Sequence, residues 1–449
     1  MIPRYHIARS LIPHYVLCAV FFLALCTIHA SAQTLKRSTL TVLKPDRVFD
    51  GNALHEAWCV AVQDSLIVYA GSSDKLSSVL STLPLRSDST ETITLKGMTL
   101  LPGFIEGHSH VLLHAYNETS WDDQVLRESR AERIARATVH LQKTLLAGFT
   151  TLRDLGTEGA GFDDVGLKHS IEKGIILGPR MIVAGRALVA TGSYGPKGFA
   201  PEFSHPVGAE EADGTDALIR AVRDQIGKGA DVVKVYADYR WGLGGEARAT
   251  FSPEELKHIV ETARSSGRPT VAHAATAEGM RRAVLAGVET IEHGDGGTPE
   301  VFKLMQERGV ALCPTLAAGD AIAQYRGWMK RIQADPKRIQ EKKVSFRAAL
   351  ASGVTICFGG DVGVFPHGDN AREMELMVEY GMKPLDVLRS ATSVNARVFH
   401  VETKVGSIAA GLLADIVCVE GNPADTISAV RDVRIVMKHG VIIKPFSFR

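Results

Sequence analysis

The chain has 449 residues, of which 45% are hydrophobic and 22% are charged, with 42 glycines and 18 prolines. This composition is that of a globular protein, and it excludes collagens, coiled coils and wholly disordered chains. The 51 basic and 50 acidic residues nearly balance, so the formal net charge is +1. The chain lacks the basic excess that binding to nucleic acid or an anionic membrane requires, and neither partner is expected.

The first 32 residues have the three parts of a signal peptide. Arg4 and Arg9 give a positive start, residues 15–28 form an apolar run, and residues 30–32 (Ala-Ser-Ala) supply the small residues of a cleavage site. A helix over the apolar run spans about 21 Å, which is short of a hydrocarbon core about 30 Å thick, so a membrane anchor is the less favoured alternative. We expect cleavage before Gln33, export to the periplasm or the medium, and no stable membrane insertion afterwards.

Both ends of the mature chain are rich in short β-type runs separated by glycine-containing turns. These runs lie within residues 40–101 and again within residues 406–443. Because the termini of a domain usually lie close together, the two pieces are predicted to share one small β-sandwich. Its predicted extent is residues 33–100 together with residues 404–449.

Between these pieces, over residues 101–403, strand-like and helix-like segments alternate eight times. The strands are predicted at residues 100–107, 150–155, 180–185, 231–237, 270–274, 290–294, 311–316 and 355–361. Helical runs are predicted at residues 131–146, 215–227, 253–266, 277–285 and 337–351. The first strands are apolar throughout, which is typical of a parallel sheet covered on both faces. The pattern predicts an α/β protein with a (β/α)8 TIM barrel, and no GxGxxG or P-loop motif supports a nucleotide-binding sheet.

Metal-compatible side chains gather at the predicted carboxyl ends of the barrel strands. His108 and His110 stand two residues apart at the exit of the first strand, so both imidazoles face the same side. Lys234 lies inside an apolar run, where an unpaired ammonium would be costly. Further candidates end the fifth, sixth and eighth strands: His273, His293 and Asp361. Each residue alone could be structural, but barrel enzymes place their chemistry at this end, and the joint pattern favours a metal site.

Several motifs in the same order resemble those of the amidohydrolase superfamily. They are GFIEGHSH (103–110), GFTTLRDLG (148–156), VAHA (271–274), IEHG (291–294), PT (314–315), FGGD (358–361) and the tail GSIAAGLLADIVCVEGNP (406–423). Within the superfamily the chain is similar to the imidazolonepropionase-like group that contains Xaa-Pro and related dipeptidases. This resemblance implies two divalent metal ions, with zinc as the expected metal, and a carboxylated lysine on the fourth strand.

The resemblance also implies a role for each metal-compatible residue. His108, His110 and Asp361 would hold the first ion, and the histidines of the fifth and sixth strands would hold the second. Lys234, carboxylated by CO2 to a carbamate, would bridge the two ions together with a hydroxide. Two such ions lower the pKa of bound water and polarise a scissile carbonyl. Asp361 would take the proton from the hydroxide and pass it to the leaving amine.

Four residues are candidates for binding substrate. Tyr236 lies two residues past Lys234 and should face the same site, where its hydroxyl would bind the developing oxyanion, although a packing role is the alternative. Arg153 would pair with a substrate carboxylate or form a structural salt bridge. Where relatives often read Thr-Gly-Gly-His-Gly after the third strand, this chain has Tyr194 in the place of the substrate-contacting histidine. His205, in the same long loop, is the candidate replacement.

These features predict an exported, binuclear, metal-dependent amidohydrolase. Its substrate would be a small molecule with an amide bond next to a free carboxylate, such as an Xaa-Pro dipeptide or an N-acyl amino acid. Hydrolysis of a cyclic amide, a lactone or a phosphoester is the alternative on the same site. A mononuclear deaminase is less favoured, because those enzymes usually carry a glutamate where this chain has Thr276. A metal-binding protein without turnover is disfavoured by the candidate base, and a homo-oligomer is compatible with the sequence.

Overall fold

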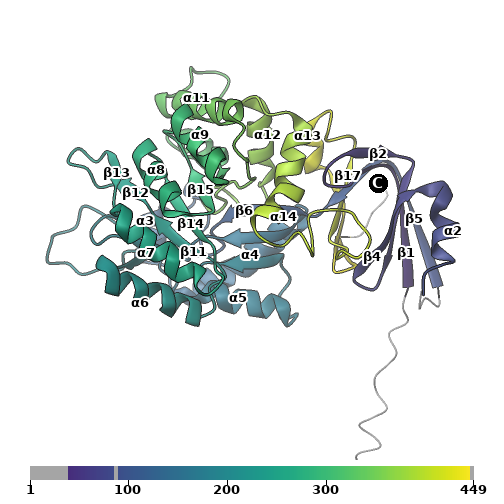
Figure 1. Ribbon diagram of the computed structural model, residues 1–449, viewed down its shortest axis with the longest axis horizontal. Helices are drawn as coiled ribbons and strands as arrows, with labels where there is room; N and C mark the ends of the chain where they lie inside the picture. Colours follow the sequence, from purple (N-terminus) through teal and green to yellow (C-terminus); the bar gives the residue numbers. More distant parts are fainter. Residues whose placement is uncertain (1–38, 85–88, 445–449) are drawn as a thin grey trace, which may run out of the picture.

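The computed structural model describes residues 39–84 and 89–444. Figure 1 shows helices surrounding a ring of strands in one half of the molecule and a sheet in the other half, which contains segments from both ends of the chain. The predicted signal peptide lies outside the described residues. Within the described ranges, no helix combines the length and the apolar character needed to span a bilayer.

Both ends of the described chain contribute to one eight-stranded sheet. Strand β5 joins the two contributions, since it pairs in parallel with β1 and antiparallel with β17. The N-terminal strands are β1 (Thr39–Phe49), β2 (Leu54–Glu56), β3 (Trp58–Gln63), β4 (Leu66–Ser72) and β5 (Ser89–Pro102), with a 3-10 turn at Ser73–Lys75 and helix α2 (Leu76–Leu80). The C-terminal strands are β17 (Ile416–Glu420), β18 (Val433–Lys438) and β19 (Val441–Lys444).

This sheet folds over on itself. The register between β1 and β5 shifts between Pro45 and Arg47, and such a bulge bends a strand. Val60 of β3 and Ile67 of β4 belong to the same buried cluster as Ile435 of β18, although these strands are not neighbours in the sheet. The β-sandwich that was predicted from the two chain ends is therefore confirmed.

Apart from the antiparallel hairpin β12–β13, the remaining strands pair in parallel and form the barrel, with helices covering its outside (Figure 1). Its regular strands are β6 (Phe104–Ser109), β7 (Phe149–Asp154), β8 (Arg180–Val183), β11 (Val233–Tyr236), β14 (Thr270–Ala274), β15 (Thr290–His293) and β16 (Ala311–Cys313). Shorter strands follow some of them: β9 (Leu188–Val189), β10 (Glu210–Glu211), β12 (Asp238–Arg240) and β13 (Ala247–Ala249). Backbone bonding between Asp231 and Val183, with an N–O distance of 2.7 Å, joins β8 to the start of β11. The TIM barrel is thus confirmed.

The segment predicted as the eighth strand closes the ring without forming a continuous strand. The Cys357 amide donates to the carbonyl of β16 residue Leu312 at 2.8 Å, and the Gly107 amide of β6 donates to the Phe358 carbonyl at 3.1 Å. The segment then leaves the extended conformation at Asp361, whose φ is +65°. Backbone bonds on both sides close the barrel, but the segment forms isolated bridges at Ile356 and Val362 instead of the continuous strand predicted at residues 355–361.

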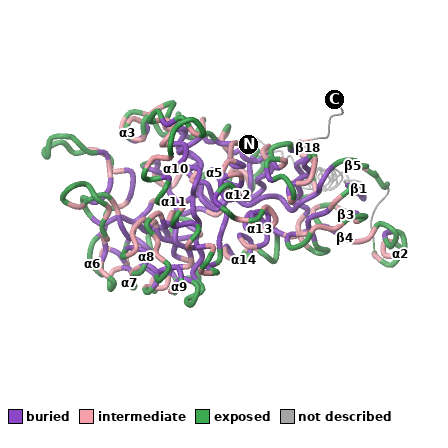
Figure 2. Tube along the Cα trace, turned by 90° about the horizontal axis from the view of Figure 1, so that it is seen from above, coloured by how far each residue is buried: buried purple, intermediate pink, exposed green. Residues whose placement is uncertain are grey.

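The helices bury one face against the barrel and expose the other (Figure 2). Helix α7 (Pro253–Arg264) illustrates how the sequence specifies them, because Ser252 and Glu255 form a capping box and Pro253 occupies the first turn. The other helices are α3 (Trp121–Leu126), α4 (Arg130–Leu146), α5 (Asp163–Glu172), α6 (Gly214–Gly227), α8 (Ala277–Ala286), α9 (Pro299–Arg308), α10 (Leu316–Tyr325), α11 (Lys337–Ser352), α12 (Ala371–Glu379), α13 (Pro384–Arg389) and α14 (Asn395–Val398). A π-turn (Ser390–Val394) and a 3-10 turn (Ile427–Arg431) complete the described elements.

Asn395 provides a test of how the barrel is closed. Its buried amide donates to the Ile105 and Phe358 carbonyls at 2.9 and 2.7 Å, and it accepts from the Phe358 amide at 3.0 Å. Asn395→Ala should lower the free energy of unfolding by about 2–5 kcal/mol, because buried backbone groups lose their partners. Urea unfolding followed by circular dichroism measures this, with the exposed Asn117→Ala as the matched control. A loss no larger than that of the control would show that Asn395 does not hold the ring closed.

Candidate metal centre

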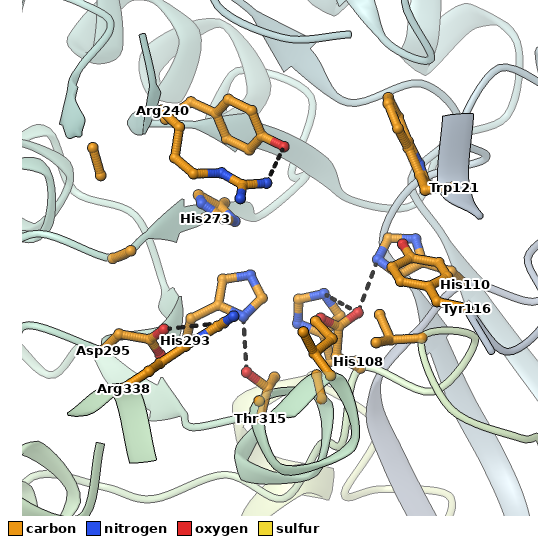
Figure 3. A pocket seen from close by; sticks show the side chains of 18 of the residues that line it. His108, His110, Tyr116, Trp121, Arg240, His273, His293, Asp295, Thr315 and Arg338 are labelled. Carbon is orange, nitrogen blue, oxygen red and sulfur yellow. Dashed lines mark hydrogen bonds and ion pairs between the residues drawn. The ribbon is translucent and has the colours of Figure 1, made fainter. Parts of the chain in front are cut away.

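A cavity of about 820 Å³ opens at the carboxyl ends of the barrel strands. Five of the predicted metal-site residues line it: His108, His110, His273, His293 and Asp361. Figure 3 shows the four histidines around a common space. The five residues come from β6, β14, β15 and the segment that follows residue 355. The structure therefore brings together residues that are spread over more than half of the chain.

Hydrogen bonds fix the orientation of three of the four histidines. In each of the three, Nδ1 is bonded to another group of the protein, which leaves Nε2 for the cavity. The partners are Glu292 Oε2 for His108, the Gly156 carbonyl for His110 and Thr315 Oγ1 for His293, each at 2.8 Å. Histidines that bind metal ions are commonly held in this way, because the bond at one nitrogen sets the tautomer and the ring direction of the other.

Asp361 lies where it can join the histidines around one ion. Its Oδ1 is 3.3 Å from His110 Nε2 and 3.7 Å from His108 Nε2. One ligand-type atom from each of His108, His293 and Asp361 lies within 4.8 Å of the other two. His293 and Asp361 both have a positive φ, +75° and +65°, which is uncommon for residues other than glycine. Backbone strain of this kind is concentrated at functional sites.

Strand β11 carries Lys234 into the floor beneath the cavity. The side chain is fully buried, and its Nζ has no hydrogen-bond partner among the described residues. Burial lowers the pKa of Lys234, because the charged form loses its hydration. A buried amine without a partner costs free energy, so this position is better explained by chemistry than by packing.

For His108, His273 and Asp361 the site favours the forms that bind metal ions, a neutral imidazole or an ionised carboxylate. Burial, with a contribution from the charge of Lys234, lowers the pKa of His108 to about 4 and that of His273 to about 3. Burial opposes ionisation of Asp361, but the charges of His108 and His110 and the hydrogen bond with His110 lower its pKa to about 2. For His110, burial is outweighed by the hydrogen bond and charge of Asp361, which raise the pKa to about 9. Without a metal ion, the His110–Asp361 pair thus retains a proton.

Arg153 does not reach the cavity, which corrects its expected contact with a substrate carboxylate. Its Nη2 donates to Glu292 at 2.8 Å, and its Nε donates to the Gly107 carbonyl at 2.8 Å. The side chain is buried, and its guanidinium carbon lies 4.0 Å from the centre of the Phe399 ring. Arg153 forms the structural salt bridge that was its alternative, and it holds the carboxylate that orients His108.

Two predicted substrate residues line the cavity, and a third does not. The Tyr236 ring stacks on His273 with a centroid distance of 4.4 Å, and the Tyr194 hydroxyl donates to Glu158 Oε2 at 2.6 Å. His205 lies outside this cavity, where its ring packs beside two exposed phenylalanines and its Nδ1 is bonded to the neighbouring Pro206 carbonyl. The expectation that His205 replaces the histidine of relatives is corrected, because His205 lines a second pocket, with Arg130 and Arg186, and not the cavity of the metal-compatible residues.

Several cavity residues were not identified from the sequence. They are Tyr116, Trp121, Glu158, Arg240, Asp295 and Arg338. Figure 3 shows Tyr116 and Trp121 on the side of His110, whereas Arg240 and Arg338 lie on the side of His273 and His293. Most of these residues belong to connections that follow barrel strands, where no periodicity predicts which side chains face the cavity. Arg240 was the one residue that its position could have indicated, because it lies in the short hairpin directly after the strand that carries Lys234.

Comparisons with known proteins identify the family. Residues 99–443 match the sequence model of the amidohydrolase family. The chain belongs to the amidohydrolase family. It is 29% identical over 417 residues to the ochratoxinase of Aspergillus niger, an alignment that covers 86% of this chain and 82% of that protein.

Solved structures extend this similarity to the fold. A Xaa-Pro dipeptidase with methionine bound in its active site has a TM-score of 0.78 and 29% identity, covering 90% of this chain and 100% of the dipeptidase. A prolidase complexed with N-methylphosphonate-L-proline has a TM-score of 0.76 and 29% identity, covering 90% of this chain and 100% of the prolidase. This amidohydrolase is therefore a hydrolase that acts on amide bonds of small molecules. The family generally uses metal ions, for which the histidine and aspartate cluster supplies candidate ligands.

The bond between His293 and Thr315 gives a test of metal binding that leaves the ligands intact. Thr315→Val keeps the shape of the side chain but removes the oxygen that holds Nδ1, so zinc affinity should fall about 10–100-fold. Competition with a chromophoric chelator measures the affinity. Thr138→Val is the control, because the Thr138 hydroxyl bonds only to Ala135 of its own helix. Equal zinc affinities for both variants would contradict the assignment of His293 as a ligand.

Proposed function

We propose that this amidohydrolase is a binuclear metalloenzyme that cleaves an amide bond next to a free carboxylate. Its substrates would be dipeptides such as Xaa-Pro or N-acyl amino acids. The observation that carries the proposal is the buried Lys234 amine, which lacks a partner and lies below a cluster of ligand-type side chains. A site for a single ion would have no use for a lysine in this position.

The donor set fits two divalent ions, and zinc is the metal we expect because imidazole and carboxylate ligands suit it. Burial favours the neutral amine of Lys234, the form that reacts with CO2 to give an N-carboxylate. That anion would bridge the two ions. When bound, the ions lower the pKa of water and polarise a scissile carbonyl. The residues that would hold them are His108, His110 and Asp361 for one ion, His273 and His293 for the other, and Lys234 for both.

Two side chains at the cavity would handle the proton and the developing charge. Asp361 is ionised over the physiological pH range, so it can accept a proton and return it to the leaving amine. Burial raises the pKa of Tyr236 well above its usual value, which keeps the phenol protonated and able to donate to an oxyanion. Both are proposed as catalytic residues on this basis.

The cationic side of the cavity supports recognition of a carboxylate. Arg240 forms no ion pair within the described residues, and its Nη2 reaches only the Tyr239 hydroxyl, at 3.5 Å. Arg338 lies on the same side, 3.5 Å from Asp295 (Figure 3). The related prolidase is complexed with N-methylphosphonate-L-proline, whose proline part has a free carboxylate. An exposed guanidinium facing the cavity suits that group.

The deaminase alternative finds no support at Thr276. The Thr276 hydroxyl donates to Asp238 at 2.7 Å and accepts from the Gly279 amide at 3.0 Å, so it caps helix α8. The position that would hold an acidic group in a deaminase is thus used for capping. Export remains part of the proposal, with cleavage before Gln33.

A panel of matched amides tests the proposed function. Zinc-loaded protein that begins at Gln33 should cleave N-acyl amino acids or dipeptides with a free carboxylate, and methyl esterification of that carboxylate should lower kcat/KM about 10-fold or more. The panel includes a cyclic amide, a lactone and a phosphoester. Turnover of these compounds alone, or indifference to esterification, would contradict the proposal.

Asp361→Asn tests the proton-transfer role. The substitution preserves size but removes the basic oxygen, so kcat should fall about 10²–10⁴-fold while KM changes little. Metal analysis of the variant separates loss of the base from loss of a ligand. Asp425→Asn, which alters an exposed aspartate far along the chain, serves as the control. A kcat within about threefold of the parent would remove Asp361 from the mechanism.

A further inference from the structure

Glu158 is a buried carboxylate in the cavity wall to which the proposed reaction assigns no role. It follows β7, lines the cavity beside His110 and is 3% exposed. Its Oε2 accepts hydrogen bonds from Trp121 Nε1 at 3.0 Å and from the Tyr194 hydroxyl at 2.6 Å. No described residue donates a hydrogen bond to its Oε1. Glu158 thus has one oxygen fixed by the protein and one left for the cavity.

The backbone that presents Glu158 is held in an unfavourable conformation. Its φ is +49°, in the left-handed region that residues other than glycine seldom adopt. Buried Arg133 fixes this turn, because its Nη1 and Nη2 donate to the carbonyls of Glu158 and Thr157 at 2.8 and 3.0 Å. A conformation of this cost persists when the surrounding structure enforces it, and such sites commonly serve function.

Among the residues that the structure describes, no lysine or arginine side chain forms an ion pair with the Glu158 carboxylate. Among the described residues, the one basic nitrogen within 4.0 Å of its carboxylate is His110 Nδ1, 3.9 Å from Oε1. That nitrogen already bonds to the Gly156 carbonyl, and a His110 bound to a metal ion through Nε2 would be neutral. A buried carboxylate that lacks a direct ion pair is costly, so a cation brought by a ligand would be favoured.

Aromatic rings complete the surroundings of this carboxylate. Trp121 meets Tyr194 edge-on with a centroid distance of 5.2 Å, and Tyr194 lies 4.9 Å from Tyr236 and 4.8 Å from Tyr239. Aromatic faces attract alkylammonium groups. Trp121 lies beside His110 and away from Arg338 and Asp295 (Figure 3).

We propose that Glu158, with Trp121 and Tyr194, forms a subsite for a cationic amino group of the substrate. The inference rests on the proposed function and narrows its substrate class to amides that carry both a carboxylate and an ammonium group. The ammonium can be the α-amine of a dipeptide or a basic side chain, and these two sources share the same chemistry.

Glu158→Gln tests the subsite, because glutamine can still accept from Trp121 and Tyr194 but carries no charge. One arm compares Ala-Pro with Nα-acetyl-Ala-Pro, and the other compares Nα-acetyl-Lys-Pro with its Nα,Nε-diacetyl form. In the arm whose amine binds to Glu158, the variant should lose about 10-fold or more in kcat/KM for the substrate with the free amine. For the acetylated substrate of the same arm, the loss should be less than about 2-fold. The exposed Glu202→Gln is the matched control and should alter neither ratio.

The wild-type protein gives a second readout that does not depend on the folding of a variant. In that same arm, it should cleave the substrate with the free amine with a higher kcat/KM than the acetylated substrate. Ratios unchanged in both arms, while the acetylated substrates are still cleaved, would overturn the ammonium subsite alone. Failure of the wild-type protein to cleave any of the four compounds, together with failure on the other dipeptides and N-acyl amino acids of the panel, would overturn the proposed function and this inference with it.

Discussion

The burial of one amine without a partner is the constraint on which the site depends. Lys234 lies between Val233 and Val235 on β11, and all three side chains are fully buried. Packing cannot explain a lysine here, because leucine or methionine would fill the space without the cost of desolvating an amine. The surrounding imidazoles and Asp361 are oriented toward the space above it, so the centre of the barrel is organised around this nitrogen.

A layer of hydrogen bonds behind the cluster keeps that organisation in place. Glu292 accepts from Arg153 and bonds to His108, which links β7, β15 and β6. Buried Glu106 accepts from the amides of His108 and Gly360 and from the Asn370 side chain at 2.8–3.0 Å, which ties β6 to the segment leading to Asp361. Such outer partners matter for metal affinity nearly as much as the ligands do. The closing of the barrel and the geometry of the centre therefore depend on the same contacts.

Regular elements and the residues at their ends could be predicted from the sequence. Alternating apolar runs located seven barrel strands, and the spacing of His108 and His110 indicated a shared site, because strand geometry fixes where such side chains point. The eighth strand was predicted as continuous, but it forms only isolated bridges at Ile356 and Val362. Arg153 and His205 were given substrate contacts that the structure does not provide. A sequence does not reveal whether an arginine at a strand end faces the cavity or a buried carboxylate, nor which way a long loop turns. Glu158 and Arg240 went unnoticed for the same reason.

The most direct test of this account is the chemical state of Lys234. A high-resolution crystal structure of the zinc-loaded protein, grown with bicarbonate, would show the atoms attached to its Nζ. The account predicts an N-carboxylate whose two oxygens each contact one of two metal ions. A bare ammonium at Lys234 with both metal ions bound would contradict it.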